Sequence, residues 1–62
     1  MIETIHEPFT AAFTGRMSSF YSVQTKRNYT FEHPLPRIEK GKAYMMELDL
    51  KNNRVRMLPV LA

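Results

Sequence analysis

Residues 43–61 alternate between apolar and polar side chains on both sides of Asn52 and Asn53. Successive side chains of a strand point to opposite faces, so this pattern predicts two β-strands, 43–50 and 54–61. Asparagine tolerates the positive φ angles of a tight turn, and we expect a two-residue hairpin turn at Asn52-Asn53. The expected register pairs Lys51 with Arg54 next to the turn. One face then carries the apolar pairs Leu50–Val55, Leu48–Met57, Met46–Pro59 and Tyr44–Leu61, and the other face carries Asp49 opposite Arg56 and Glu47 opposite Leu58.

A second hairpin is predicted upstream, in "SFYSVQTKRNYTFEH". Tyr, Val, Thr and Phe, which favour strands, alternate with polar residues along 19–25 and again along 29–33. Between these two runs, Asn28 is the residue best suited to the left-handed position of a three-residue turn.

Residues 9–14 allow two interpretations. Phe9, Ala11 and Phe13 alternate as on a strand, whereas a short helix could begin at Pro8 and end at Gly15. The Thr and Phe content favours the strand.

Prolines mark the other boundaries. Pro34 and Pro36 predict a stiff connector over 33–37. Pro59 has no N–H for a ladder, so the last strand is expected to be a sheet edge near its end.

These elements predict an all-β fold, a small antiparallel meander or open barrel of four or five strands that ends in a C-terminal β-hairpin. The alternative is an α+β fold with one short N-terminal helix on a four-stranded sheet. We expect a single small domain over residues 1–62.

Phe20 and Tyr21 cannot both face inward on a regular strand, so one of the two core assignments must fail. The predicted core comprises Phe9, Phe13, Phe20, Tyr21, Val23, Tyr29, Phe31, Ile38, Tyr44, Met46, Leu48, Leu50, Val55, Met57 and Leu61.

The composition limits what such a domain can be. A chain of 62 residues without cysteine has a small core and no disulfides, so we expect self-association, most simply as a homodimer. No apolar run approaches the length of a membrane span and no signal peptide is recognisable, so we expect a cytoplasmic protein without membrane contact. The net charge of +3 is small for a dedicated nucleic-acid binder. We also expect the chain to be a complete small open reading frame, a format common among phage and mobile-element regulators.

Catalytic and metal-binding patterns are weak. No serine and histidine have the spacing of a nucleophile and its base, and Gly15 and Gly41 do not form a phosphate-binding loop. His6-Glu7 and Glu32-His33 are adjacent pairs, whose members point to opposite faces of a strand and do not chelate a metal unaided. We therefore expect neither an enzyme nor a bound cofactor or metal.

The C-terminal hairpin carries the main functional expectation. Its outer face is expected to hold an apolar cluster of Met45, Leu58 and Val60, bordered by Arg54, Arg56 and Glu47. An exposed apolar centre with a charged rim is typical of a protein interface. Either this cluster contacts a partner, or the N-terminal segment covers it in a closed barrel. We expect a regulator, adaptor or inhibitor that binds another protein.

The stretch "KRNYTFEH" supports an alternative, which is nucleic-acid binding. Lys26 and Arg27 would contact phosphates from one hairpin tip, and Lys51 from the other, while Tyr29 and Phe31 would stack on bases. Equally, both aromatic rings could belong to the core. If the two tips lie on one side, Lys40 and Lys42 could join them in a single positive patch.

Overall fold

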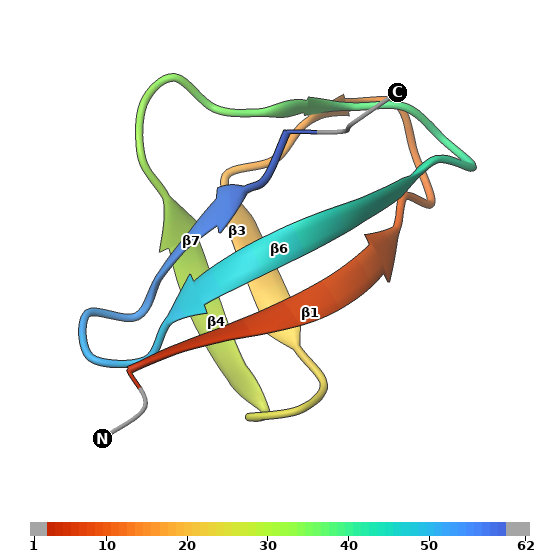
Figure 1. Cartoon of the computed structure of the whole chain (residues 1–62). Helices are drawn as coiled ribbons and strands as arrows, with labels where there is room; N and C mark the ends of the chain where they lie inside the picture. Colours follow the sequence, from red (N-terminus) through yellow and green to blue (C-terminus); the bar gives the residue numbers. More distant parts are fainter. Residues whose placement is uncertain (1–2, 60–62) are drawn as a thin grey trace.

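The computed structural model describes residues 3–59, and within this range the chain forms strands, turns and loops without any helix. The predicted all-β fold is confirmed. Five strands form one curled sheet in the order β1-β6-β7-β4-β3, and β2 and β5 form a second, two-stranded sheet (Figure 1). The strands are β1 (Thr4–Thr10), β2 (Gly15–Arg16), β3 (Ser19–Ser22), β4 (Arg27–Phe31), β5 (Arg37–Ile38), β6 (Ala43–Asp49) and β7 (Arg54–Met57).

The sheet is an open barrel with one parallel contact. β4 and β7 run parallel over Thr30↔Arg54 and Phe31↔Val55, while the other pairs are antiparallel. β7 is thus an interior strand where β4 pairs with it, and it ends before Pro59. The prediction that the last strand is a sheet edge near its end is therefore correct only beyond Val55, where β4 no longer pairs with β7.

The two sheets share one long antiparallel ribbon. β1 pairs with β6 and β2 with β5 in the same register, because the intervening bends, 11–14 and 39–42, have equal lengths. Backbone bonds maintain the ladder through the bend, from Ala11 N to Lys42 O at 2.9 Å and from Gly41 N to Ala11 O at 2.9 Å. Gly41 adopts a φ of 88°, which glycine accepts without strain.

The C-terminal hairpin forms, but its predicted register is wrong by two residues. Leu48 faces Val55 and Met46 faces Met57, so the connection is a four-residue loop over 50–53. The Asp49 carboxylate stabilises this loop by accepting bonds from the side chain and backbone of Asn52 and the backbone of Lys51. An even shift leaves every side chain on its predicted face, which is why the burial pattern alone did not reveal it.

The upstream hairpin also forms with a longer loop than predicted. β3 and β4 are joined by residues 23–26, and Lys26, with a φ of 59°, takes the left-handed position in place of Asn28. Phe20 faces the core and Tyr21 is 53% exposed, so Phe20 was the correct one of the two assignments.

The N-terminal segment is a strand, as favoured, but it spans Thr4–Thr10 and not 9–14. Hydrogen bonds from Leu50 N to Glu3 O and from Ala11 N to Lys42 O show that odd-numbered residues of this strand bond to β6. Pro8 therefore sits where an N–H would point away from the sheet, and its missing donor costs no ladder bond.

The curl of the sheet brings its edge strands together at Glu7. This β1 residue is 3% exposed, and its carboxylate accepts bonds from Ser22 Oγ at 2.6 Å, Val23 N at 3.1 Å and Gln24 N at 3.3 Å. Gln24 Nε2 in turn donates to His6 O at 3.1 Å. Side-chain hydrogen bonds thus connect the two edges.

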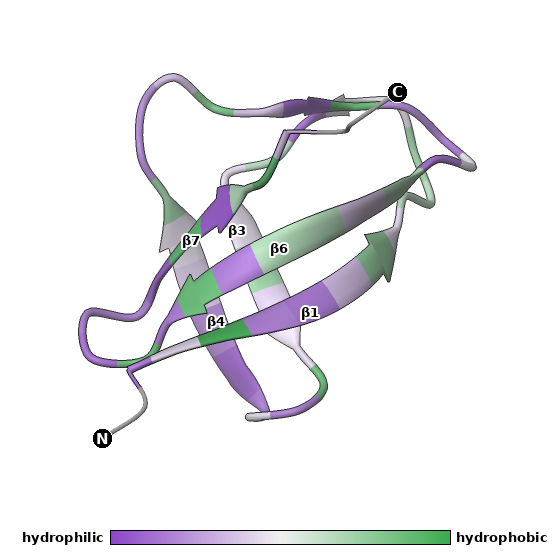
Figure 2. Ribbon diagram, viewed as in Figure 1, coloured by the Kyte–Doolittle hydropathy of each residue, from purple (hydrophilic) through white to green (hydrophobic). Residues whose placement is uncertain are grey.

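The core lies inside the curl. Figure 2 shows green and purple bands along β1 and β6, and the burial of β6 alternates from residue to residue. Of the predicted core, Phe13, Tyr21 and Val23 are exposed, because they lie in the bend or on the outer side of the β3 hairpin, and Leu61 lies outside the described residues. The buried apolar residues are Ala11, Met17, Phe20, Tyr29, Phe31, Ile38, Tyr44, Met46, Leu48 and Val55, and Phe9, Leu50 and Met57 are partly buried against them.

Candidate functional site

The candidate site is the face of β1, β6 and β7 that points away from the core, which we call the outer face. Pairing across the three strands arranges its side chains in rows. The rows are Thr4, Asp49 and Arg54; His6, Glu47 and Arg56; and Pro8, Met45 and Leu58.

The middle row is a polar network. Arg56 Nε donates to Glu47 Oε1 at 2.8 Å, and His6 Nε2 lies 3.3 Å from Glu47 Oε2. The bond from Arg56, followed by that from His6, holds the pKa of the Glu47 carboxyl below its ordinary value. Glu47 therefore stays charged at neutral pH and holds one side chain from each neighbouring strand.

The third row is apolar, with Pro8 and Met45 exposed and Leu58 half-buried. Met45 is 42% exposed at the centre of β6, with Pro8 opposite it on β1. Leu58 N donates to Met45 O at 2.9 Å, which makes Leu58 the neighbour of Met45 on the other side. The structure thus brings together two of the three predicted cluster residues and adds Pro8. Val60 lies outside the described residues.

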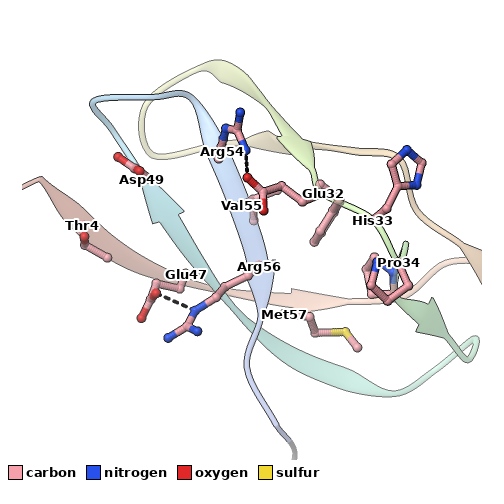
Figure 3. A pocket seen from close by; sticks show the side chains of 12 residues that line it. Thr4, Glu32, His33, Pro34, Glu47, Asp49, Arg54, Val55, Arg56 and Met57 are labelled. Carbon is pink, nitrogen blue, oxygen red and sulfur yellow. Dashed lines mark hydrogen bonds and ion pairs between the residues drawn. The ribbon is translucent and has the colours of Figure 1, made fainter.

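A cleft of about 460 Å³ opens beside this network, between β7 and the segment that follows β4 (Figure 3). Arg54 forms an ion pair with Glu32 across it, and Pro34 and Pro36 line the side opposite β7. The predicted rim residues Arg54 and Arg56 therefore border the cleft, each with a carboxylate partner. Its apolar lining comes from Phe31, Val55 and Met57, where β4 and β7 separate.

Met57 presents backbone groups to this cleft. The bond between Leu58 N and Met45 O sets the alternation of the β6–β7 ladder, so the N–H and C=O of Met57 point away from β6. In the part of the chain that the structure describes, no backbone bond joins Met57 to residues 32–36. The cleft therefore combines apolar side chains with one open position of a strand edge.

No protein-family model, curated protein or solved structure matches this chain. Its site must therefore be interpreted from its own geometry.

The residues predicted for nucleic-acid binding do not lie together on one surface, because the aromatic ones are buried and the basic ones are exposed. Tyr29 and Phe31 are core residues, with Tyr29 fully buried, so neither ring is available to stack on a base. Lys26, Arg27 and Lys51 are exposed.

The parallel run of β4 and β7 brings both hairpin tips to the same end of the sheet, as the sequence could not show. Lys40 and Lys42 precede β6 and lie at the opposite end, so they do not extend a patch at the tips.

The histidines and carboxylates of the described residues do not form a metal site. Within residues 3–59, no three His, Cys, Asp or Glu side chains converge as a metal site would require. Glu7, the neighbour of His6 in the sequence, is buried at the β1–β3 contact and faces away from His6. No local signal in the sequence marked Glu7 as a buried contact.

Within residues 3–59, no helix is long and apolar enough to cross a membrane.

Proposed function

We propose that this protein is a non-enzymatic binding module that acts on another protein through its outer face. Exposure of Met45 at the centre of a three-stranded surface carries this proposal. Pro8 and Leu58 extend the apolar row, and Arg56 and Glu47 border it. An apolar centre beside a charged rim is the usual composition of a protein interface.

The cleft supports an extended segment as the element that the partner contributes. Strand addition supplies main-chain hydrogen bonds, and pockets beside the strand select side chains. The N–H and C=O of Met57 that point away from β6 are available for main-chain hydrogen bonds to an added strand. The apolar lining at Phe31 and Val55 provides a pocket for its side chains. A module of this kind acts as a regulator, adaptor or inhibitor by occupying its partner.

The test is affinity capture from nuclease-treated lysate of the source cells. Met45→Glu combined with Leu58→Glu places two charges in the apolar row and should remove the captured partner. The matched control is Tyr21→Glu with Val23→Glu, which changes two exposed apolar residues elsewhere and should leave capture intact. Capture that survives the first pair of changes, or that nuclease abolishes, contradicts the proposal.

A second copy of the chain is the other candidate for this face. Sedimentation velocity at micromolar concentrations distinguishes a second copy of the chain from a different protein partner. A dimer that forms through the outer face should dissociate in the Met45→Glu, Leu58→Glu variant. A monomer at all concentrations assigns the face to a different protein.

A further inference from the structure

Arg16 and Arg37 form the only like-charged cross-strand pair in the ladders that the structure describes. They lie directly opposite each other on β2 and β5. The other cross-strand pairs of charged residues combine opposite signs, as in Glu47↔Arg56 and Asp49↔Arg54. The surface therefore pairs charges favourably everywhere in these ladders except at one position.

The two guanidinium groups start from closely spaced backbone positions. Met17 N donates to Pro36 O at 3.0 Å, so the neighbouring Arg16–Arg37 pair is of the non-hydrogen-bonded type, in which side chains are closest. Ile38, the next residue, is fully buried, which directs Arg37 and its partner outward. Both arginines are exposed.

One of the two side chains is already held in place. Arg16 Nη1 donates to Leu35 O at 2.8 Å, which anchors the guanidinium and leaves most of its N–H groups available. Anchoring before binding lowers the entropy lost when a ligand is fixed. No carboxylate within residues 3–59 forms an ion pair with Arg16 or Arg37.

Like charges placed directly opposite each other destabilise a sheet, so the pairing of these two charges does not stabilise the fold. The nearest charged neighbours along the chain do not relieve it. Glu39 pairs with Lys42 at 3.4 Å, and Lys40 adds a further positive charge just beyond β5 without an ion pair among the described residues. An anion bound between Arg16 and Arg37 would relieve their repulsion.

We propose that Arg16 and Arg37 bind phosphate groups of a nucleic-acid strand, with Lys40 as an auxiliary contact. The planar fork of arginine matches a phosphate through two parallel N–H donors. The pair lies on the two-stranded ribbon and does not line the cleft between β7 and the segment that follows β4. An open surface favours a long polyanion, which combines many weak contacts, over a small free anion, which needs an enclosing site. This site is independent of the outer-face proposal.

Fluorescence anisotropy with a labelled 20-nucleotide oligo-dT, titrated from about 50 to 200 mM salt, tests the assignment. Arg16→Gln with Arg37→Gln should weaken binding on the order of tenfold at the low-salt end. It should also make the log–log salt dependence shallower by about 1.4, because single strands lose about 0.7 per phosphate contact. Lys26→Gln with Arg27→Gln removes the same charge at the far hairpin tip and serves as the matched control.

A larger loss in the Arg16, Arg37 variant than in the control supports the site. Equal losses show that only net charge matters and overturn it, as does a wild-type protein that does not bind the oligonucleotide at 50 mM salt. Binding of a phosphoserine peptide in place of the oligonucleotide reassigns the pair to a phosphoprotein and also overturns the proposal.

Thermal unfolding supplies an independent readout. Arg37→Gln removes the repulsion and keeps the bond from Arg16 Nη1 to Leu35 O, so its unfolding temperature should rise, and a marked decrease means that the pair is structural. The same single variant repeats the binding test if the double variant folds poorly.

Discussion

The Ser22 hydroxyl donates a 2.6 Å hydrogen bond to the Glu7 carboxylate, and this contact joins the two edge strands of the five-stranded sheet. Both residues are buried, and Ser22 Oγ also accepts a bond from Thr25 N at 3.2 Å. An ionised carboxylate can be buried when several donors replace its hydration. The Glu7 carboxylate is thus the main hydrogen-bond acceptor at the seam of the open barrel, beside the bond from Gln24 Nε2 to His6 O.

Replacing Glu7 by alanine should therefore open the seam. The Ser22 hydroxyl and the N–H groups of Val23 and Gln24 would lose their acceptor, and we expect a loss of about 2–3 kcal/mol in the free energy of unfolding. Urea denaturation measures it. The control is Glu32→Ala, which removes an exposed carboxylate and should change stability little. Equal effects of the two substitutions would show that Glu7 does not hold the seam.

The same carboxylate should make stability depend on pH. Burial raises the pKa of Glu7, but the bonds from Ser22, Val23 and Gln24 outweigh it and leave the pKa below its ordinary value of 4.5. A depressed folded-state pKa means that the stabilisation is complete above the unfolded-state pKa and is lost as pH falls through the folded-state pKa.

Urea midpoints of the wild type and Glu7→Gln, compared from pH 7 to pH 3, isolate this contribution from that of other carboxylates. The wild type should be the more stable at pH 7, and its advantage should shrink below about pH 4.5. A difference that stays constant over this range contradicts the assignment.

The observed hairpin register predicts different results for two adjacent residues. Leu48 is fully buried, and Leu48→Ala should cost about 2–5 kcal/mol in unfolding free energy. Asp49→Ala should instead loosen the 50–53 loop, because it removes the acceptor for Lys51 and Asn52. Hydrogen exchange should show faster exchange confined to this loop. Protection of the loop that persists in Asp49→Ala argues against the four-residue connection.

Pro8 should protect the free edge of β1. Its position points outward, where an N–H would be available to pair with a strand of another molecule. Pro8→Val supplies that N–H and a residue that favours strands, so we expect faster aggregation by light scattering. The control is Thr10→Val, which makes the same face of β1 more apolar but adds no backbone N–H, because Thr10 already has one. Aggregation by both variants alike would assign the effect to hydrophobicity.

Much of the strand content and facing could be predicted from the sequence. Alternation at Tyr44, Met46 and Leu48 identified the buried face of β6 correctly, because a half-buried strand requires a period of two. The same reasoning placed Met45 on the outer face, where the structure finds it exposed. Tyr21 and Val23 alternate equally well, but their burial depends on which side of β3 the sheet curls toward.

The lengths of the loops could not be predicted from the alternation of apolar and polar residues. A shift of two residues preserves every facing, so hydrophobic periodicity cannot choose between a two-residue and a four-residue turn at Asn52-Asn53. In the observed four-residue loop, the Asp49 carboxylate accepts bonds from Asn52 and Lys51, and this side-chain contact is invisible to hydrophobic periodicity.

By itself, the sequence determined the two hairpins and which face of β6 and β7 is apolar, and it favoured an all-β fold over the α+β alternative, because these properties follow from local alternation and local turn chemistry. Tertiary structure alone decided that β1 pairs with β6 and that β4 runs parallel to β7. It likewise decided that Glu7 meets Ser22 and that Arg16 faces Arg37. These contacts join residues that are distant along the chain, and their energies depend on how the whole sheet curls and on the groups it buries together. No pattern within a single strand carries that information.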